Sequence, residues 1–274
     1  MSALRRTDPV RLLAFFGAIA INVAQTVRFA VEETGRSIVL LGSSVEWLFR
    51  PPFRFKQYLI QLDFVGVQSV YLICITGLFT GMVLALQGHI AMSRYGAESL
   101  IGGAVALSLA RELGPVLSAL MVIGRAGSAI IAELGSMRNT DQIDALASMA
   151  VHPVQYLVVP RVVAATIVLP FLALLFEFSG MVGAYLIYTA QLGQDGAVFI
   201  NSIKDYLEAE DITHGLIKAV VFGLILSLVS CSKGFYATGG ARGVGLATTR
   251  GVVISSLLIL ASDYVMTALM FKPS

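Results

Sequence analysis

Arg111 and Glu112 stand next to each other inside a run of residues, 99–124, that is otherwise apolar. At the centre of a bilayer each charged side chain costs roughly 2.5–3.5 kcal/mol on insertion-based scales. Charges kept at that depth line a cavity, a pathway or a contact between helices. Because neighbouring helical residues point about 100° apart, we expect each of the two side chains to find its partner on another helix.

Three further ionisable residues interrupt apolar runs. By residue count, Glu177 lies at a mid-bilayer depth similar to that of Glu112, while Lys218 and Asp263 share a depth nearer the outer surface. Two interpretations stay open, since intramembrane charges serve both helix packing and pathways. Either the charges only hold helices together, or Glu112 faces a central cavity while Arg111 anchors the bundle. The predicted intramembrane charge network consists of Arg111, Glu177, Lys218 and Asp263.

The composition is that of an integral membrane protein. Hydrophobic residues make up 57% of the 274 and charged residues only 13%, about half the charged share of a soluble domain. The apolar runs are continuous and do not alternate, which favours helices over a barrel. The sequence predicts an all-α membrane protein with five transmembrane helices at about 64–88, 99–124, 162–191, 213–232 and 251–271.

The basic N-terminal part, 1–61, is predicted to be a separate cytoplasmic or interfacial unit ahead of a transmembrane domain at 62–274. Its residues 12–24 resemble a signal-peptide core, but we favour an amphipathic helix lying in the membrane interface. The polar stripe that supports this interpretation comprises Arg11, Asn22, Gln25, Glu32 and Arg36.

Loop charge predicts the orientation. With the N-terminus in the cytoplasm, 14 Lys and Arg residues fall on the inside and three on the outside. The links around 125–161 and 232–250 are then cytoplasmic, and the C-terminus lies outside.

Several long segments resemble one family. LARELGPVLSALMVIGRAGSA (109–129) and AELGSMRNTDQIDAL (132–146) are similar to the signature region of the MlaE/YrbE permeases, which are subunits of ABC transporters that work with MCE-domain proteins. The similarity extends to 77–88, 151–161 and 247–271, and so covers nearly all of the chain after residue 60. His152 departs from the pattern, because an acidic residue is common there.

The resemblance implies partners and a location. It implies a homodimer in the bacterial inner membrane, with the C-terminus in the periplasm, that binds a cytoplasmic ABC ATPase and a periplasmic ring of MCE-domain protein. A cytoplasmic STAS-domain protein belongs to the same set of expected partners. The implied cargo is phospholipid or a similar hydrophobic lipid, as in systems that maintain outer-membrane lipid asymmetry.

The resemblance also implies a cytoplasmic coupling helix between the second and third spans, which docks on the ATPase. Its expected residues are Glu133, Gly135, Met137, Gln142, Ile143, Asp144 and Leu146. Gly127 and Gly135 are expected to permit tight turns in this segment. The alternative to a coupling helix is an ordinary solvated loop helix.

A stripe at the end of the first span predicts a substrate site. Its residues recur on one face, provided that the helix continues past His89, and in similar proteins two copies of this segment enclose a lipid-sized cavity. Met and Tyr side chains suit acyl chains near a polar exit. The predicted substrate-binding residues are Leu84, Gly88, Ala91, Met92, Tyr95, Glu112 and Leu113.

The sequence lacks the motifs for ATP binding and for metal binding. No Gly-x-x-x-x-Gly-Lys-Ser/Thr motif is present, so ATP must be hydrolysed by a partner and the chain itself is not expected to be an enzyme. The three histidines are scattered and the two cysteines lack ligand spacing, so no metal or cofactor is expected. A net charge of +2 does not favour a nucleic-acid partner.

Two alternative functions compete with lipid transport. A proton-coupled secondary transporter would use Glu112, Glu177 and Asp263 as a relay, and a membrane scaffold would transport nothing. No internal repeat is evident, which disfavours the first, and buried charges on several helices disfavour the second. Five spans also suit a pathway built between two copies.

Overall fold

The computed structural model describes residues 55–270 and, before them, residues 35, 39, 40, 42–44, 46, 47 and 50. The predicted interfacial stripe from Arg11 to Arg36 lies outside the described residues, so this helix stays a prediction. The division into 1–61 and 62–274 also stays a prediction.

The first span is one continuous helical rod with a wide turn near its start. A π-helical turn lies between α2, which mixes polar and apolar residues, and the apolar run. A left-handed Gly96, with φ of 65°, ends the rod. The helix does continue past His89, as far as Met92, before a single 3₁₀ turn. Its parts are α2 (Phe55–Leu62), η1 (Asp63–Val67), α3 (Gln68–Met92) and η2 (Ser93–Tyr95).

The second span also runs as one helical rod, from Glu98 to Asn139. Two π-helical turns interrupt it, and they contain the charged residues Arg111, Glu112 and Arg125. Such turns are frequent at functional sites. Its parts are η3 (Glu98–Leu100), α4 (Ile101–Ser108), η4 (Leu109–Leu113), α5 (Gly114–Val122), η5 (Ile123–Gly127) and α6 (Ser128–Asn139).

The turn expected at Gly127 or Gly135 lies elsewhere. Both glycines are inside helical segments. A Cβ on Gly135 would lie 3.1 Å from Val244 and 3.2 Å from Ala237, so this glycine serves close packing. The chain turns instead at Asp141, which has a left-handed φ of 56°, and a short helix, α7 (Gln142–Ser148), follows.

The remaining spans follow the predicted order. The third continues as a helix through Pro170, and a capping box of Glu208 and Asp211 begins the fourth. The elements are η6 (Val154–Val158), α8 (Val159–Leu186), η7 (Ile187–Gln191), α9 (Gly196–Tyr206), α10 (Ala209–Phe235) and α11 (Gly240–Met270). Within the described part of the chain, five helical rods are long and apolar enough to cross a membrane, as predicted.

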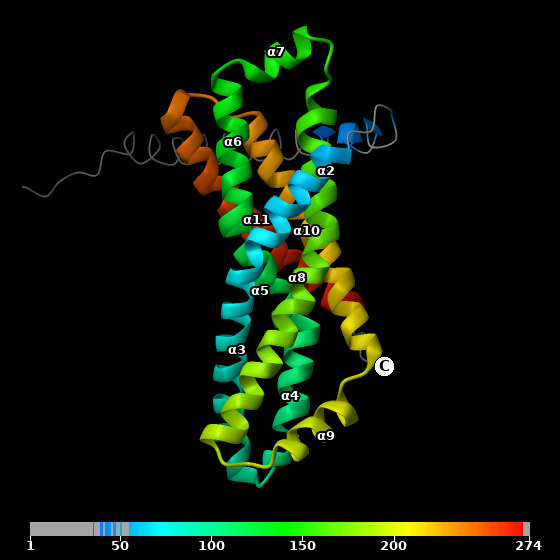
Figure 1. Cartoon of the computed structure of the whole chain (residues 1–274), viewed down its shortest axis with the longest axis vertical. Coiled ribbons are helices and arrows are strands. Elements are labelled where there is room, and N and C mark those ends of the chain that lie inside the picture. The colour runs from blue at the N-terminus through cyan, green and yellow to red at the C-terminus, as the bar shows by residue number, and fades with distance from the viewer. Residues whose placement is uncertain are drawn as a thin grey trace, which may run out of the picture.

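The bundle has two distinct ends. α7 lies at one end of the long axis and α9 at the other, and the orange junction of α10 and α11 lies in the half that carries α7 (Figure 1). The two links predicted to be cytoplasmic therefore lie toward the same end.

α3 and α8 are in very close contact along small residues. A Cβ on Gly81 would lie 1.8 Å from the carbonyl oxygen of Gly180, and one on Gly183 would lie 2.1 Å from that of Leu78. Small residues let helix backbones approach in this way within a membrane.

The two outer rods are much less covered than the others. Only 28% of the apolar window of the first span and 11% of that of the fifth are buried, against 56–67% for the other three. On α3 the exposed apolar side chains Tyr71, Phe79 and Val83 are spaced by multiples of four, so they lie along one face.

Candidate functional site

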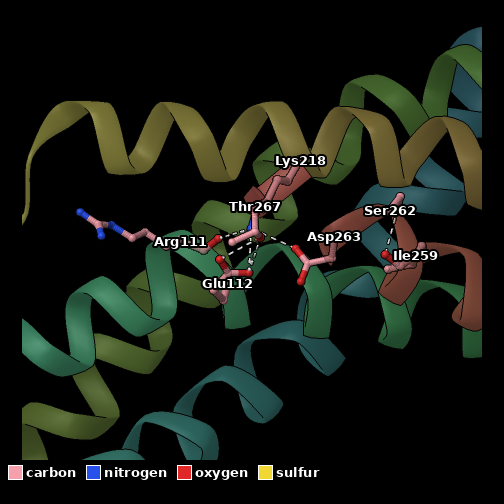
Figure 2. A network of polar contacts seen from close by, with 7 residues as sticks. All are labelled: Arg111, Glu112, Lys218, Ile259, Ser262, Asp263 and Thr267. Atoms are coloured by element: carbon pink, nitrogen blue, oxygen red, sulfur yellow. Dashed lines mark hydrogen bonds and ion pairs between the residues drawn. The ribbon is translucent and has the colours of Figure 1, made fainter. Parts of the chain in front are cut away.

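An ammonium group buried in the bundle joins three spans. Lys218 on α10 is fully buried, and its Nζ donates hydrogen bonds to Glu112 Oε2 at 2.7 Å and Thr267 Oγ1 at 2.7 Å. Figure 2 shows these side chains converging from η4, α10 and α11. We refer to Glu112, Lys218, Asp263 and Thr267 as the lysine cluster.

The three ammonium protons have three acceptors. The third hydrogen bond goes to the carbonyl oxygen of Arg111 at 3.0 Å. Thr267 accepts from Lys218 and lies 3.1 Å from Glu112 Oε1, to which its hydroxyl donates. Asp263 Oδ1 lies 3.0 Å from Nζ but receives no hydrogen bond within the described residues. Asp263 therefore contributes mainly charge.

A proline leaves the carbonyl oxygen of Arg111 without its usual helical hydrogen bond. Pro115 has no N–H, so it cannot donate to the carbonyl oxygen four residues earlier, which belongs to Arg111. That oxygen accepts from Lys218 instead. The π-helical turn and the proline together explain why a carbonyl is available to a side chain in the middle of a span.

Arg111 itself points away from the lysine cluster (Figure 2). Its Nε donates to Asp211 Oδ1 at 2.6 Å, and the Asp211 side chain is only 5% exposed. As expected, Arg111 and Glu112 find partners on other helices. Both partners lie on α10, so this helix is held to the second span at two levels.

Glu177 is not joined to the others. It is buried on α8, and its Cγ would lie 2.6 Å from a Cβ on Gly114, so it does share the depth of η4. The described residues provide it with no ion pair to Arg111 or Lys218. The structure thus brings Lys218 and Asp263 together with Glu112, but places Arg111 in a separate pair and Glu177 apart.

The predicted substrate residues fall at two levels. Gly88 of the stripe lies beside Ile101, with 3.5 Å between a Gly88 Cβ and Ile101 Cγ2. Glu112 lies eleven residues beyond Ile101, or about 16 Å along the rod. Leu84, Met92 and Leu113 are partly buried against the core, whereas Ala91 and Tyr95 are exposed.

The predicted coupling residues belong to two helices. Glu133, Gly135 and Met137 lie on α6, where Glu133 pairs with Arg161 at 2.9 Å. The rest lie on α7. Of these, Ile143 is buried and Leu146 half-buried. Gln142 and Asp144 are exposed, and Asp144 pairs with Arg138 at 2.7 Å.

The family profile described as Permease MlaE matches residues 58–269, which is most of the chain. The chain belongs to the MlaE permease family. A probable ABC transporter permease of Rickettsia conorii is 46% identical over 90% of this chain and 95% of its own length.

Two other relatives carry more specific names. The intermembrane phospholipid transport system permease protein MlaE of Haemophilus influenzae is 41% identical over 77% of this chain and 81% of its own length. The chloroplastic protein TRIGALACTOSYLDIACYLGLYCEROL 1 of Arabidopsis thaliana is 37% identical over 85% of this chain and 67% of its own length. Membership of the MlaE family and five apolar rods make this chain a multi-pass membrane protein.

Sequence reasoning missed three polar residues of this MlaE permease. Asp211 falls just outside the predicted fourth span of 213–232, yet Asp211, Gly215 and Lys218 follow the i, i+4, i+7 spacing of one helix face. Thr267 is four residues after Asp263 and so shares its face. Arg125 donates to Ser69 Oγ at 2.9 Å and to the carbonyl oxygen of Phe64, which holds η5 against η1. No local motif signals this last contact.

Within the described residues no three His, Cys, Asp or Glu side chains lie together as metal ligands. The arrangement holds the second, fourth and fifth spans in a fixed register through the shared ammonium of Lys218.

Proposed function

We propose that the chain is the permease subunit of an ABC transporter that moves phospholipid between the inner membrane and an MCE-domain protein. It acts as a homodimer and is driven by a separate ATPase. The observation that carries this proposal is the match of the family profile to residues 58–269, together with a relative named for intermembrane phospholipid transport. ATP hydrolysis is the partner's reaction.

The unpartnered face of the first span supports a second copy. Exposed apolar residues follow one side of α3, and this span is far less covered than the second, third and fourth. Two copies meeting through α3 would bring both substrate stripes into one enclosure. The proposal needs such an enclosure, because Tyr95 is 86% exposed in the single chain.

The lysine cluster fixes the positions of three spans relative to one another. It joins the second, fourth and fifth spans at one depth, about 16 Å along the rod from the stripe. Lipid tails occupy the stripe, and ATP-driven approach of the two α7 helices narrows the space between the copies. Packed helices of this kind switch between discrete arrangements.

A proton relay has less support. Glu112 and Asp263 share Lys218, but Glu177 has no polar link to them within the described residues. A relay through all three carboxylates would need such a link.

Orientation follows from the basic links. The end of the bundle that carries α7 faces the cytoplasm and the ATPase, and the end that carries α9 faces the periplasm and the MCE-domain protein. The charge count of the links supports this arrangement.

Changing Tyr95 to Asp is expected to reduce phospholipid bound to the purified protein several-fold. A charge at position 95, the last residue of the stripe, makes this end unfavourable for acyl chains. The measurement is lipid mass spectrometry on protein purified in mild detergent. Ser99→Asp, an exposed residue of the same link, should retain wild-type lipid. Equal lipid in Tyr95→Asp and wild type would move the cavity elsewhere.

Changing Asp144 to Lys is expected to reduce co-purification of the ATPase several-fold while membrane insertion stays normal. The exposed carboxylate lies on the face of α7 that is free to dock, and reversing its charge places a repulsive contact there. Asp205→Lys, an exposed residue of α9 at the other end, is the matched control.

Asp144 also pairs with Arg138, so a second variant separates docking from local structure. Arg138→Asp combined with Asp144→Lys restores an ion pair of opposite direction. If the double variant recovers ATPase binding, Asp144 acts by shaping the α6–α7 link and not by contact with the ATPase.

A further inference from the structure

A cavity of about 220 Å³ lies between α2, α6 and the start of the third span. It is bordered by Gln57, Gln61, Glu133, Tyr156 and Arg161. None of these residues belongs to the lysine cluster or to the substrate stripe. The cavity is on the half of the bundle that carries α7, because α2 and α6 both lie there (Figure 1).

Arg161 is a buried cation with only part of its bonding capacity used. Its side chain is 3% exposed, and Nη2 pairs with Glu133 Oε2 at 2.9 Å. Its Nε and Nη1 are buried and have no hydrogen-bond partner within the described residues. A guanidinium has five N–H donors in a planar fork, and burial of unsatisfied polar groups is unfavourable. An acceptor in the adjoining cavity would satisfy one of these two nitrogens, since Nε–H and Nη1 point to different sides of the guanidinium.

Gln61 places a second unsatisfied polar group at the same cavity. Its Oε1 is buried and has no partner within the described residues. Since the oxygen and nitrogen of an amide are assigned from their partners, the NH₂ group can equally face this position and donate. Arg161 and Gln61 then offer donors to one anionic ligand. A phosphate group, with several acceptor oxygens, suits an arginine fork.

The cavity adjoins a larger open pocket of apolar character. This pocket, of about 600 Å³, shares Ile60, Gln61 and Glu133 with the cavity. It adds Leu59 and Phe64 to the lining, along with the polar residues Lys56, Asp63 and Gln68. Leu59 is 65% exposed and Ile60 48% exposed. A polar chamber that opens onto exposed apolar side chains matches a phosphate group attached to a hydrocarbon chain.

The depth of the site is that of a lipid headgroup. The first rod has 41 residues, or about 60 Å of helix, which is twice the hydrocarbon thickness of about 30 Å. Its apolar run begins at Phe64, so Gln57 and Gln61 lie just outside the hydrocarbon. Arg161 is close to the start of the third apolar run and reaches the same level.

We propose that this cavity binds the phosphate group of a phospholipid from the membrane leaflet on the α7 side. Arg161 holds the phosphate, Gln61 adds a donor, and an acyl chain lies along Leu59, Ile60 and Phe64. Glu133 accepts from Nη2, and the bound phosphate accepts from Nη1, at the end of the guanidinium fork. This inference rests on the proposed lipid transport, since it supplies a loading position far from the Tyr95 end.

The test measures binding to the full chain in the complex with its ATPase, after exchange into detergent. One probe is dioctanoyl phosphatidylglycerol and the other is inorganic phosphate, each followed by native mass spectrometry. We compare wild type with Arg161→Met and Gln61→Glu. The second variant retains the Arg161–Glu133 pair and so guards against a result caused by misfolding. Arg250→Met removes an exposed arginine of α11 and is the control.

The expected result is lipid binding that weakens at least tenfold in Arg161→Met and Gln61→Glu but not in Arg250→Met, with little binding of inorganic phosphate. Equally tight binding of inorganic phosphate that depends on Arg161 would overturn the lipid assignment in favour of a free phosphate. Lipid binding unaffected by both variants would overturn the site.

The proposed function can be separated from this inference. Lipid bound at the stripe depends on Tyr95, and ATPase binding depends on Asp144. If those two dependences hold while Arg161→Met binds lipid normally, only the loading site fails. If the wild-type complex contains no lipid at either place, the transport proposal fails with it.

Discussion

Lys218→Met should abolish lipid transport and lower the free energy of unfolding by about 3 kcal/mol, because removing one partner of a buried ion pair leaves an uncompensated charge. Methionine fills a similar volume but supplies neither charge nor donors. Glu112, Asp263, Thr267 and the Arg111 carbonyl would then lose their common partner. Protonation of a carboxylate relieves part of this cost, which keeps the expected loss near the lower end of such measurements.

Two measurements check this prediction: thermal unfolding of the purified protein and lipid transfer by the reconstituted complex. Lys204→Met, an exposed lysine of α9, controls for loss of a positive charge and should behave like wild type. Adding Glu112→Gln and Asp263→Asn to Lys218→Met should recover much of the stability, since no unpaired charge is then buried, but not transport. Wild-type stability and transport in Lys218→Met would contradict the role assigned to the lysine cluster.

Gly81→Ala should separate α3 from α8 and destabilise the bundle. The new Cβ would lie 1.8 Å from the carbonyl oxygen of Gly180, a backbone atom that cannot rotate away. Ordinary contact begins near 3.4 Å, so the two helices must move apart by roughly 1.5 Å locally. Overpacking of this kind costs about 1–3 kcal/mol and sometimes more. The intrinsic helix preference of alanine over glycine, about 1 kcal/mol, acts in the opposite direction and is smaller.

Gly88→Ala is the matched comparison, because it lies on the same helix and its Cβ would be 3.5 Å from Ile101, an ordinary contact. Its thermal stability should equal or exceed that of wild type. The clash explanation would be wrong if Gly81→Ala unfolded at the same temperature as Gly88→Ala.

The five spans could be predicted because hydrophobicity and length alone decide whether a helix crosses a bilayer. The same reasoning gave depth, by counting residues from the end of each apolar run. It predicted correctly that Lys218 and Asp263 share a level, and they lie 3.0 Å apart. It was wrong to place this pair nearer the outer surface than Glu112, because the Glu112 carboxylate lies 2.7 Å from Lys218 Nζ. It could not give the direction in which each side chain points around its helix. The predicted depth of Glu177 therefore agrees with its position beside Gly114, but its side chain does not join the other charged residues.

The ends of the helices were harder to predict than their middles. Asp211 follows Glu208 and Glu210, and a run of acidic residues is typical of a solvated link. In the folded chain it closes a capping box on α10 and pairs with Arg111. Gly135 was read as a turn residue because glycine permits one, but its lack of a side chain is used here for packing against Ala237 and Val244. Only tertiary contacts distinguish these two uses of glycine.

The shared ammonium has a consequence for how the chain is made. Lys218 must enter the bilayer when α10 is inserted, and on its own it costs roughly 2.5–3.5 kcal/mol. Glu112, which accepts a hydrogen bond from Lys218, is on the second span and is made before α10, whereas Asp263 is on α11, the next segment to leave the ribosome. The fourth span should therefore enter the lipid against the second span, and the fifth span should complete the neutralisation of Lys218. A chain truncated before α10 should leave Glu112 without its cation in the membrane during biosynthesis.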